Sequence, residues 1–318
     1  MFLEHFKNAF STKKPKIKKI PKDKAMIISS AIERRYKLSS NEFYKDYVEL
    51  GKPVIISGVI INWNGFDKWS LKYLKNLSPS LNIYAKKFSD NKIEICSLTM
   101  ERYIELIENY EQDPQNNTRP PYCHDLPLFS LIPSLVKDAQ PFPYDYLPEW
   151  YWHKWWRYCQ FFLGSSNSVT PLHFDCLLTN NIFFQIVGRK QFTILLPEDA
   201  KYCYRKGWRW FLVNPENPDL NKYPEYKNAR PIQFIVNPGD ILYMPPGTLH
   251  HVRSLDMSIS FNIDWHTPKS SLNGLAAITK GMPIQNLYYN FLLAMGLVLK
   301  LPPQIIFKFY KSYLNYVS

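Results

Sequence analysis

The feature that most constrains the fold of this chain is a series of short apolar segments between residues 159 and 266. They comprise residues 159–164, 181–187, 191–196, 232–236, 241–245 and 257–264, and turn-forming residues bound each of them. Segments of this length and spacing are typical of strands in an antiparallel sandwich or barrel. The 25 prolines and the 16% of aromatic residues argue against a helical bundle or coiled coil. The sequence therefore predicts a mainly β domain.

Helical patterns flank this region on both sides. Helices are predicted at 43–50, 66–77 and 98–110, with a β-branched strand at 54–61. The segment 271–318 returns to helical spacing and carries an apolar stripe of Ile284, Leu287, Tyr288, Phe291, Leu292 and Met295. This stripe fits either a helix packed on the main domain or the seam of a homodimer.

Charge and composition limit the setting and the partners. Lys and Arg exceed Asp and Glu by 39 − 27 = 12, which favours acidic partners such as nucleic acid or an acidic peptide. Residues 1–25 contain eight lysines, so we expect a mobile arm or a dedicated binding arm. Five cysteines without a C-x-x-C pair indicate neither a disulfide framework nor a cysteine zinc site, and they favour a reducing, cytoplasmic location. Lys300 interrupts the apolar run 291–299, so no membrane span is predicted.

The candidate chemistry starts at His173-Phe174-Asp175. Residues i and i+2 of a strand share a face, so the imidazole and the carboxylate can converge. A turn, an apolar strand and a Pro/Gly bend then lead to His250. We expect His250 rather than the adjacent His251 to face inward, because neighbouring strand residues point to opposite faces. Two histidines and one carboxylate form the facial triad of non-haem Fe(II) oxygenases.

The ordered motifs resemble the JmjC and cupin-like dioxygenases, which use Fe(II), 2-oxoglutarate and O₂. The pattern is closest to the asparaginyl hydroxylase that modifies hypoxia-inducible factor, and the similarity extends over about residues 40–270. The matching stretches are T-P-L-H-F-D at 170–175, N-I-F-F-Q-I-V-G-R-K at 181–190, N-P-D at 217–219, P-G-D-I-L-Y-M-P at 238–245, L-H-H at 249–251 and N-I-D-W at 262–265. The resemblance implies a double-stranded β-helix of the cupin type with flanking and C-terminal helices.

The resemblance also implies roles for individual residues. His173, Asp175 and His250 would bind Fe(II). Lys190 and Thr170 would hold the distal carboxylate of 2-oxoglutarate, a dianion that needs a buried cation. Asn181 and Asn262 would line the same pocket, and Tyr122 would donate its phenol to the carboxylate.

A long insert at 198–231 separates the third and fourth predicted strands. It interleaves Trp208 and Trp210 with Arg205, Lys206 and Arg209, which suits base stacking, an acidic peptide, or a cap over the barrel mouth.

The predicted organisation is a basic arm at 1–25, an oxygenase domain at 26–270 and a C-terminal helical segment at 271–318. The predicted function is hydroxylation of a protein side chain by an Fe(II)/2-oxoglutarate dioxygenase. Two alternatives remain: a hydroxylase of a modified nucleoside in RNA, and a non-catalytic cupin-like binding module.

Overall fold

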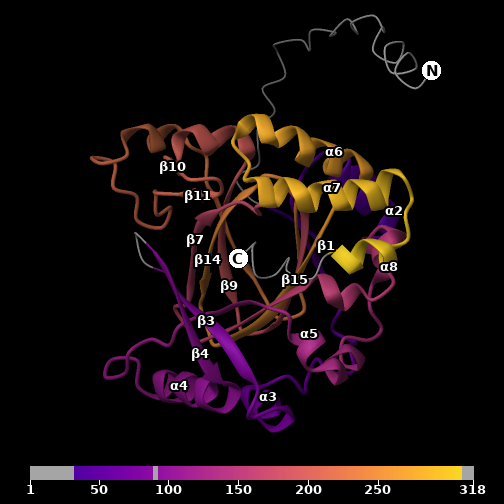
Figure 1. Ribbon diagram of the computed structural model, residues 1–318. Coiled ribbons are helices and arrows are strands. Elements are labelled where there is room, and N and C mark those ends of the chain that lie inside the picture. The colour runs from indigo at the N-terminus through magenta and orange to yellow at the C-terminus, as the bar shows by residue number, and fades with distance from the viewer. Residues whose placement is uncertain (1–31, 89–91, 310–318) are drawn as a thin grey trace, which may run out of the picture. The chain divides into compact units, whose positions relative to one another are not determined.

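Two β-sheets dominate residues 32–88 and 92–309, which are the residues that the computed structural model describes (Figure 1). Within these ranges the larger sheet has the strand order β1 (Glu33–Tyr36), β2 (Val54–Ser57), β13 (Ile241–Met244), β8 (Asn180–Val187), β15 (Ser258–Trp265), β6 (Cys159–Gly164) and β5 (Cys123–Leu126). In the same ranges the smaller sheet has the order β10 (Arg205–Lys206), β11 (Trp210–Phe211), β7 (Val169–His173), β14 (Leu249–Ser254), β9 (Lys190–Leu195) and β12 (Ile232–Val236). The predicted mainly β, cupin-type fold is confirmed.

Except for the edge strand β1, the larger sheet is buried on both faces, and strand alternation decides which residues reach the site. In β8, Ile182 and Phe184 pack into the main aromatic core, whereas Phe183 packs with Phe192 of the opposite sheet. Because the period of a strand is two, Asn181 lies on the same inward face as Phe183. This double burial explains why these strands read as continuous apolar runs rather than as alternating ones.

Helices cover the ends and the outer side of the larger sheet. Their bounds are α2 (Ser40–Glu42), α3 (Leu71–Leu77), α4 (Met100–Gln112), α5 (Leu128–Leu131), α6 (Pro268–Ala276), α7 (Ile284–Val298) and α8 (Pro303–Ile306). Ser39 begins α2 with a capping box to Glu42, and Thr267 begins α6 in the same way with Ser270. Such caps satisfy backbone N–H groups that have no partner within the helix.

Several predicted bounds differ from the structure. The helix predicted at 43–50 continues α2 as a π-helical segment, Phe43–Val48. The helix predicted at 66–77 begins only at Leu71, because the Ser70 hydroxyl caps it. The strand predicted at 54–61 ends at Ser57, where its pairing with β1 also ends. In each case the type of element was predicted correctly, and only its bounds differ by a few residues.

The hairpin of β3 (Asn82–Phe88) and β4 (Ile93–Thr99) was not predicted. Its outer face carries exposed apolar side chains such as Tyr84 and Ile95, so polar and apolar residues do not alternate clearly along the two strands. The helix predicted from residue 98 begins at Met100, because Leu98 and Thr99 still pair with β3.

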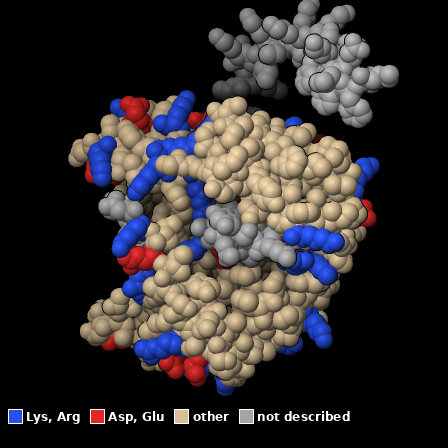
Figure 2. Space-filling view, viewed as in Figure 1, with Lys and Arg blue, Asp and Glu red and all other residues tan. Residues whose placement is uncertain are grey.

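The C-terminal helices pack on the domain with one side only. Tyr289, Leu292 and Leu293 of α7 are buried, whereas Ile284, Tyr288 and Phe291 are exposed. The predicted stripe is therefore divided between a packed face and an open one. Figure 2 shows that the surface over α6 and α7 is nearly free of charged side chains.

The expectation for the N-terminal arm cannot be compared with the structure. The Lys-rich arm at 1–25 lies outside the described residues. None of the helices within the described ranges has the length and apolar character that crossing a membrane requires.

Candidate metal centre and co-substrate pocket

The structure brings the three predicted metal ligands together. A ligand atom of each of His173, Asp175 and His250 lies within 4.8 Å of the other two. The register of the smaller sheet explains this, since His173 at the end of β7 is directly opposite His250 in β14. Asp175 lies two residues beyond the end of β7 and not on the strand, so the turn that leaves the strand aims its carboxylate.

Backbone carbonyls fix both imidazole rings. The Nδ1 atom of His173 is 2.8 Å from the carbonyl oxygen of Pro171, and that of His250 is 3.2 Å from the oxygen of Thr248. A carbonyl only accepts, so Nδ1–H donates and Nε2 keeps its lone pair for a metal. Burial, followed by the charges of His250 and Arg209, lowers the pKa of His173 well below its usual range, which keeps this ring neutral.

A chain of polar groups orients the third ligand. Asn181 donates from Nδ2 to Asp175 Oδ2 and to Asp264 Oδ1, each over 3.0 Å. Asn262 donates to the same oxygen of Asp264 over 3.2 Å. The register places Asn181 opposite Asp264, so strand pairing builds this network. The side-chain oxygens of Asn181 and Asn262 have no hydrogen-bond partner within the described residues.

Lys190 is a buried cation that pairs with no carboxylate of the described residues. It is 1% exposed, and its ammonium donates to the Tyr122 hydroxyl and the Ser260 hydroxyl, each over 2.8 Å. The rings of Phe162 and Phe183 lie 5.2 Å from Nζ. Burial lowers the pKa of Lys190 to about 7. A charge in such a place is costly unless an anion joins it.

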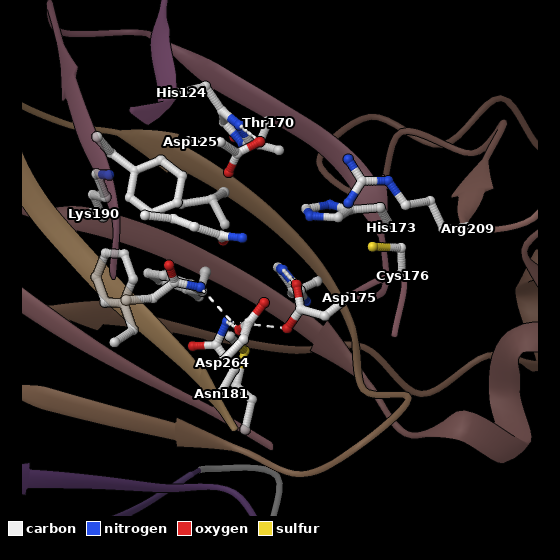
Figure 3. A pocket seen from close by; sticks show the side chains of 18 of the residues that line it. His124, Asp125, Thr170, His173, Asp175, Cys176, Asn181, Lys190, Arg209 and Asp264 are labelled. Atoms are coloured by element: carbon white, nitrogen blue, oxygen red, sulfur yellow. Dashed lines mark hydrogen bonds and ion pairs between the residues drawn. The ribbon is translucent and has the colours of Figure 1, made fainter. Parts of the chain in front are cut away.

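These residues line one cavity that encloses about 560 Å³, part of it open to solvent. Figure 3 shows Lys190 on one side of it and His173 with Asp175 on the other. The eight predicted site residues all line this cavity: His173, Asp175, His250, Lys190, Thr170, Asn181, Asn262 and Tyr122. His251 faces away and lies 3.9 Å from Glu216.

The residues present fit a metal with a dianionic co-substrate. Two lone-pair nitrogens and one carboxylate converge as a facial triad does. The ammonium of Lys190, which has only neutral partners, lies across the same cavity.

The cavity also contains groups that the sequence did not single out as site residues. Asp125 pairs with Lys86 over 2.9 Å and with His124 over 2.7 Å, and both Asp125 and His124 line the cavity. Asp264 and Ser260 lie on the inward face of β15 together with Asn262. The strand alternation around Asn262 was the signal that would have identified them.

The predicted functional insert contacts the site. It supplies the hairpin of β10 and β11, and Trp210 in β11 pairs with His173 of β7. The Trp210 ring lies 4.9 Å from the His173 ring, and Arg209 lines the cavity. Trp208 instead holds the loop after Asp175, donating from Nε1 to the carbonyl oxygen of Cys176 over 2.7 Å.

Comparisons with known proteins agree with this geometry. A model of the cupin-like domain family matches residues 40–271. Lysine-specific demethylase 8 of Danio rerio is 30% identical over 247 residues, which cover 71% of this chain and 56% of that protein. The tRNA wybutosine-synthesizing protein 5 of Mus musculus is 24% identical over 257 residues, which cover 73% of this chain and 76% of that protein. The bifunctional peptidase and (3S)-lysyl hydroxylase JMJD7 of Homo sapiens is 24% identical over 262 residues, which cover 70% of this chain and 80% of that protein.

The chain spans about half the length of the first curated relatives that it matches. The curated proteins that match this chain include ones named for a JmjC domain, for demethylation and for hydroxylation. The specific likeness to the asparaginyl hydroxylase stays a prediction. The matched region contains all the ligand candidates and every strand of both sheets except β1, and the chain therefore belongs to the cupin-like domain family.

Proposed function

We propose that this chain is an Fe(II)- and 2-oxoglutarate-dependent oxygenase that hydroxylates a protein side chain. The observation that carries the proposal is a pair of features in one cavity. One is the cluster of His173, Asp175 and His250; the other, across from it, is the Lys190 ammonium, whose partners within the described residues are two neutral hydroxyls. Iron with 2-oxoglutarate and O₂ would supply the oxidising chemistry.

The residues of the chain position the reactants. His173, Asp175 and His250 would hold the metal and leave one side of it open. Lys190 would bind the distal carboxylate of 2-oxoglutarate, with the hydroxyls of Thr170 and Tyr122 beside it. The apolar rings of Phe162, Phe183 and Phe192 exclude water from that end of the cavity.

The first experiment does not need the unknown substrate. Fe(II) and 2-oxoglutarate are added to the purified protein without oxygen, and the visible charge-transfer band of the chelate is recorded. The wild type should show the band, Asp175→Ala should abolish it, and Lys190→Ala should weaken it. Asp67→Ala, an exposed aspartate outside the cavity, is the matched control and should keep the band. A folded wild type without the band would favour the non-catalytic binding module.

A second candidate is hydroxylation of a modified nucleoside in RNA. The relative named as a tRNA wybutosine-synthesizing protein supports it, because the match covers 76% of that protein. The segment 200–211 adds Lys201, Arg205, Lys206 and Arg209 without any acidic residue. RNA that stimulates succinate release, with an affinity that falls steeply as salt is added, would support this reading over a protein substrate.

Three further expectations stay predictions: hydroxylation rather than demethylation, an intracellular location, and a homodimer formed through the C-terminal helices. The five cysteines, all of them described, form no disulfide.

A further inference from the structure

Arg209 is tied to the metal-binding motif by its backbone. Its carbonyl oxygen accepts a hydrogen bond over 3.1 Å from the N–H of Phe174, the residue between His173 and Asp175. The neighbouring Trp210 pairs with His173. The position of Arg209 is therefore fixed relative to the first two ligands, and Figure 3 shows its guanidinium beside His173.

The side chain of Arg209 is held by ring packing, and its charge acts on Asp125 and Asp264 only from beyond hydrogen-bond distance. Its guanidinium lies 4.6 Å from the centre of the Trp210 ring, and that ring in turn packs on His173. It makes no hydrogen bond or ion pair with any residue of 32–88 or 92–309. A guanidinium that packs on an aromatic ring without hydrogen bonds keeps its N–H donors available for a planar anion.

The carboxylates that share the cavity are already engaged. Asp125 binds Lys86 and His124, whereas Asp175 and Asp264 both accept from Asn181. Lys190 lies on the side where the co-substrate carboxylate would bind. Among the described residues, Arg209 is thus a cation near the metal site with no carboxylate at hydrogen-bond distance.

The surroundings favour one carboxylate over a chain of phosphates. The nearby Arg205 is turned back into its own hairpin, since its guanidinium donates to the Trp208 carbonyl and lies over the Phe174 and Trp208 rings. RNA recognition draws on several phosphate contacts along a strand. The one guanidinium of Arg209 at the cavity wall fits a single acidic side chain.

We propose that Arg209 binds an acidic side chain of the peptide substrate, at or next to the residue that is oxidised. This deepens the proposed function and rests on it. It also separates this chain from relatives named for lysine, because a lysine side chain that entered the cavity would meet Arg209.

The test measures charge preference in binding. Labelled twelve-residue peptides (Gly-Ser-X)₄, with X as Glu, Gln or Lys, are titrated by fluorescence anisotropy into the protein with Fe(II) and 2-oxoglutarate in the absence of oxygen. We expect the Glu peptide to bind at least about ten-fold more tightly than the Lys peptide. Arg209→Gln should remove this preference, and Arg209→Glu should reverse it. Arg102→Gln, which removes the same charge from α4, should leave it unchanged.

Four results would overturn the inference. One is the absence of a charge preference in the wild type, and another is a preference that survives in Arg209→Gln. The third is tighter binding of a uridine dodecanucleotide than of the Glu peptide, with the difference lost in Arg209→Gln, which would assign Arg209 to RNA.

A loss of 2-oxoglutarate affinity in Arg209→Gln with unchanged peptide preference would assign Arg209 to the co-substrate and would equally overturn the inference. The chelate band of the wild type separates a failure of the Arg209 proposal from a failure of the proposed oxygenase function. Its presence without a charge preference refutes only the role of Arg209, whereas its absence refutes the oxygenase itself.

Discussion

Lys190 shows how a single residue can prepare a site for its ligand. The ammonium is surrounded by rings and two hydroxyls, and burial lowers its pKa to about 7, from 10.5 for an ordinary lysine. A bound dianion favours the protonated form, so binding above pH 7 requires the uptake of a proton. The same shift makes the ligand-free fold more stable as the pH rises from about 7 towards 10, because the unfolded chain holds that proton more tightly.

The affinity for 2-oxoglutarate should therefore fall as the pH rises. For a pKa of about 7 we expect a loss of roughly eight-fold between pH 6.5 and pH 8. The measurement is a titration of the chelate band without oxygen at each pH. Lys190→Arg keeps its charge throughout this range and should show a nearly flat profile. A wild-type profile as flat as that of Lys190→Arg would contradict the role of Lys190.

Asp264 is predicted to be a positioning residue. Its Oδ1 accepts from both Asn181 and Asn262, and Asn181 also holds the metal ligand Asp175. Asp264→Ala should weaken Fe(II) binding about ten-fold, a typical cost of losing a group that orients a metal ligand. Equilibrium metal titration measures this. Asp256→Ala, whose carboxylate pairs with Arg189 at 2.8 Å, should leave the affinity unchanged.

At the scale of elements, α7 supports the loop that follows Asp175. Asn286 donates to the carbonyl oxygen of Cys176 and Asn290 to that of Leu177, each over 3.3 Å. Asn290 also accepts with its Oδ1 a hydrogen bond from His266 Nε2 over 3.1 Å, so it links α7 to the end of β15. The C-terminal helix is therefore joined to the metal site by hydrogen bonds as well as by apolar packing.

Removing these bonds should affect both stability and the metal site. Asn290→Ala leaves buried polar groups without a partner, and we expect a loss of about 1–3 kcal/mol in the free energy of unfolding. Fe(II) affinity should fall as well, because the Asp175 loop loses its support. Urea denaturation and metal titration measure the two effects. Gln285→Ala on the exposed face of α7 should change neither. An Asn290→Ala protein with wild-type metal affinity would limit α7 to a packing role.

At the scale of the whole molecule, the open face of α7 is the candidate surface for a second copy. Ile284 is 65% exposed, Tyr288 45% and Phe291 50%, and α7 carries no charged residue. An exposed apolar area of this kind is typical of an interaction site. Deleting the chain after residue 270 would also remove the buried Tyr289 and Leu293, so a surface substitution is the better test.

We predict that Phe291→Asp dissociates a dimer into monomers without unfolding the chain. A charge at an exposed position costs the monomer little, whereas in an apolar seam it is left unpaired. Size-exclusion chromatography with light scattering gives the mass. Leu131→Asp, at an exposed position of α5, is the control and should keep the wild-type mass. A wild type that is already monomeric at micromolar concentration would contradict the prediction.

Local sequence patterns were enough to predict the class of fold and the set of ligand candidates. The apolar runs at 159–164 and 232–236 became β6 and β12 with those bounds, because strand periodicity and turn residues are local properties. His173 and His250 were identifiable because their motifs are continuous in sequence. The hairpin of β3 and β4 was missed because its exposed side carries apolar residues and shows no alternation.

Only the tertiary structure decided what surrounds the ligands. Asp264 faces Asn181 because β15 pairs with β8 in one register, and Arg209 reaches the metal site because β11 joins the edge of β7. Neither strand pairing nor register is encoded within a single segment, since both depend on how two distant segments bury their apolar faces together. The division of α7 into a packed face and an open face follows for the same reason: helical spacing predicts an apolar stripe, but the rest of the domain determines which part of it is covered.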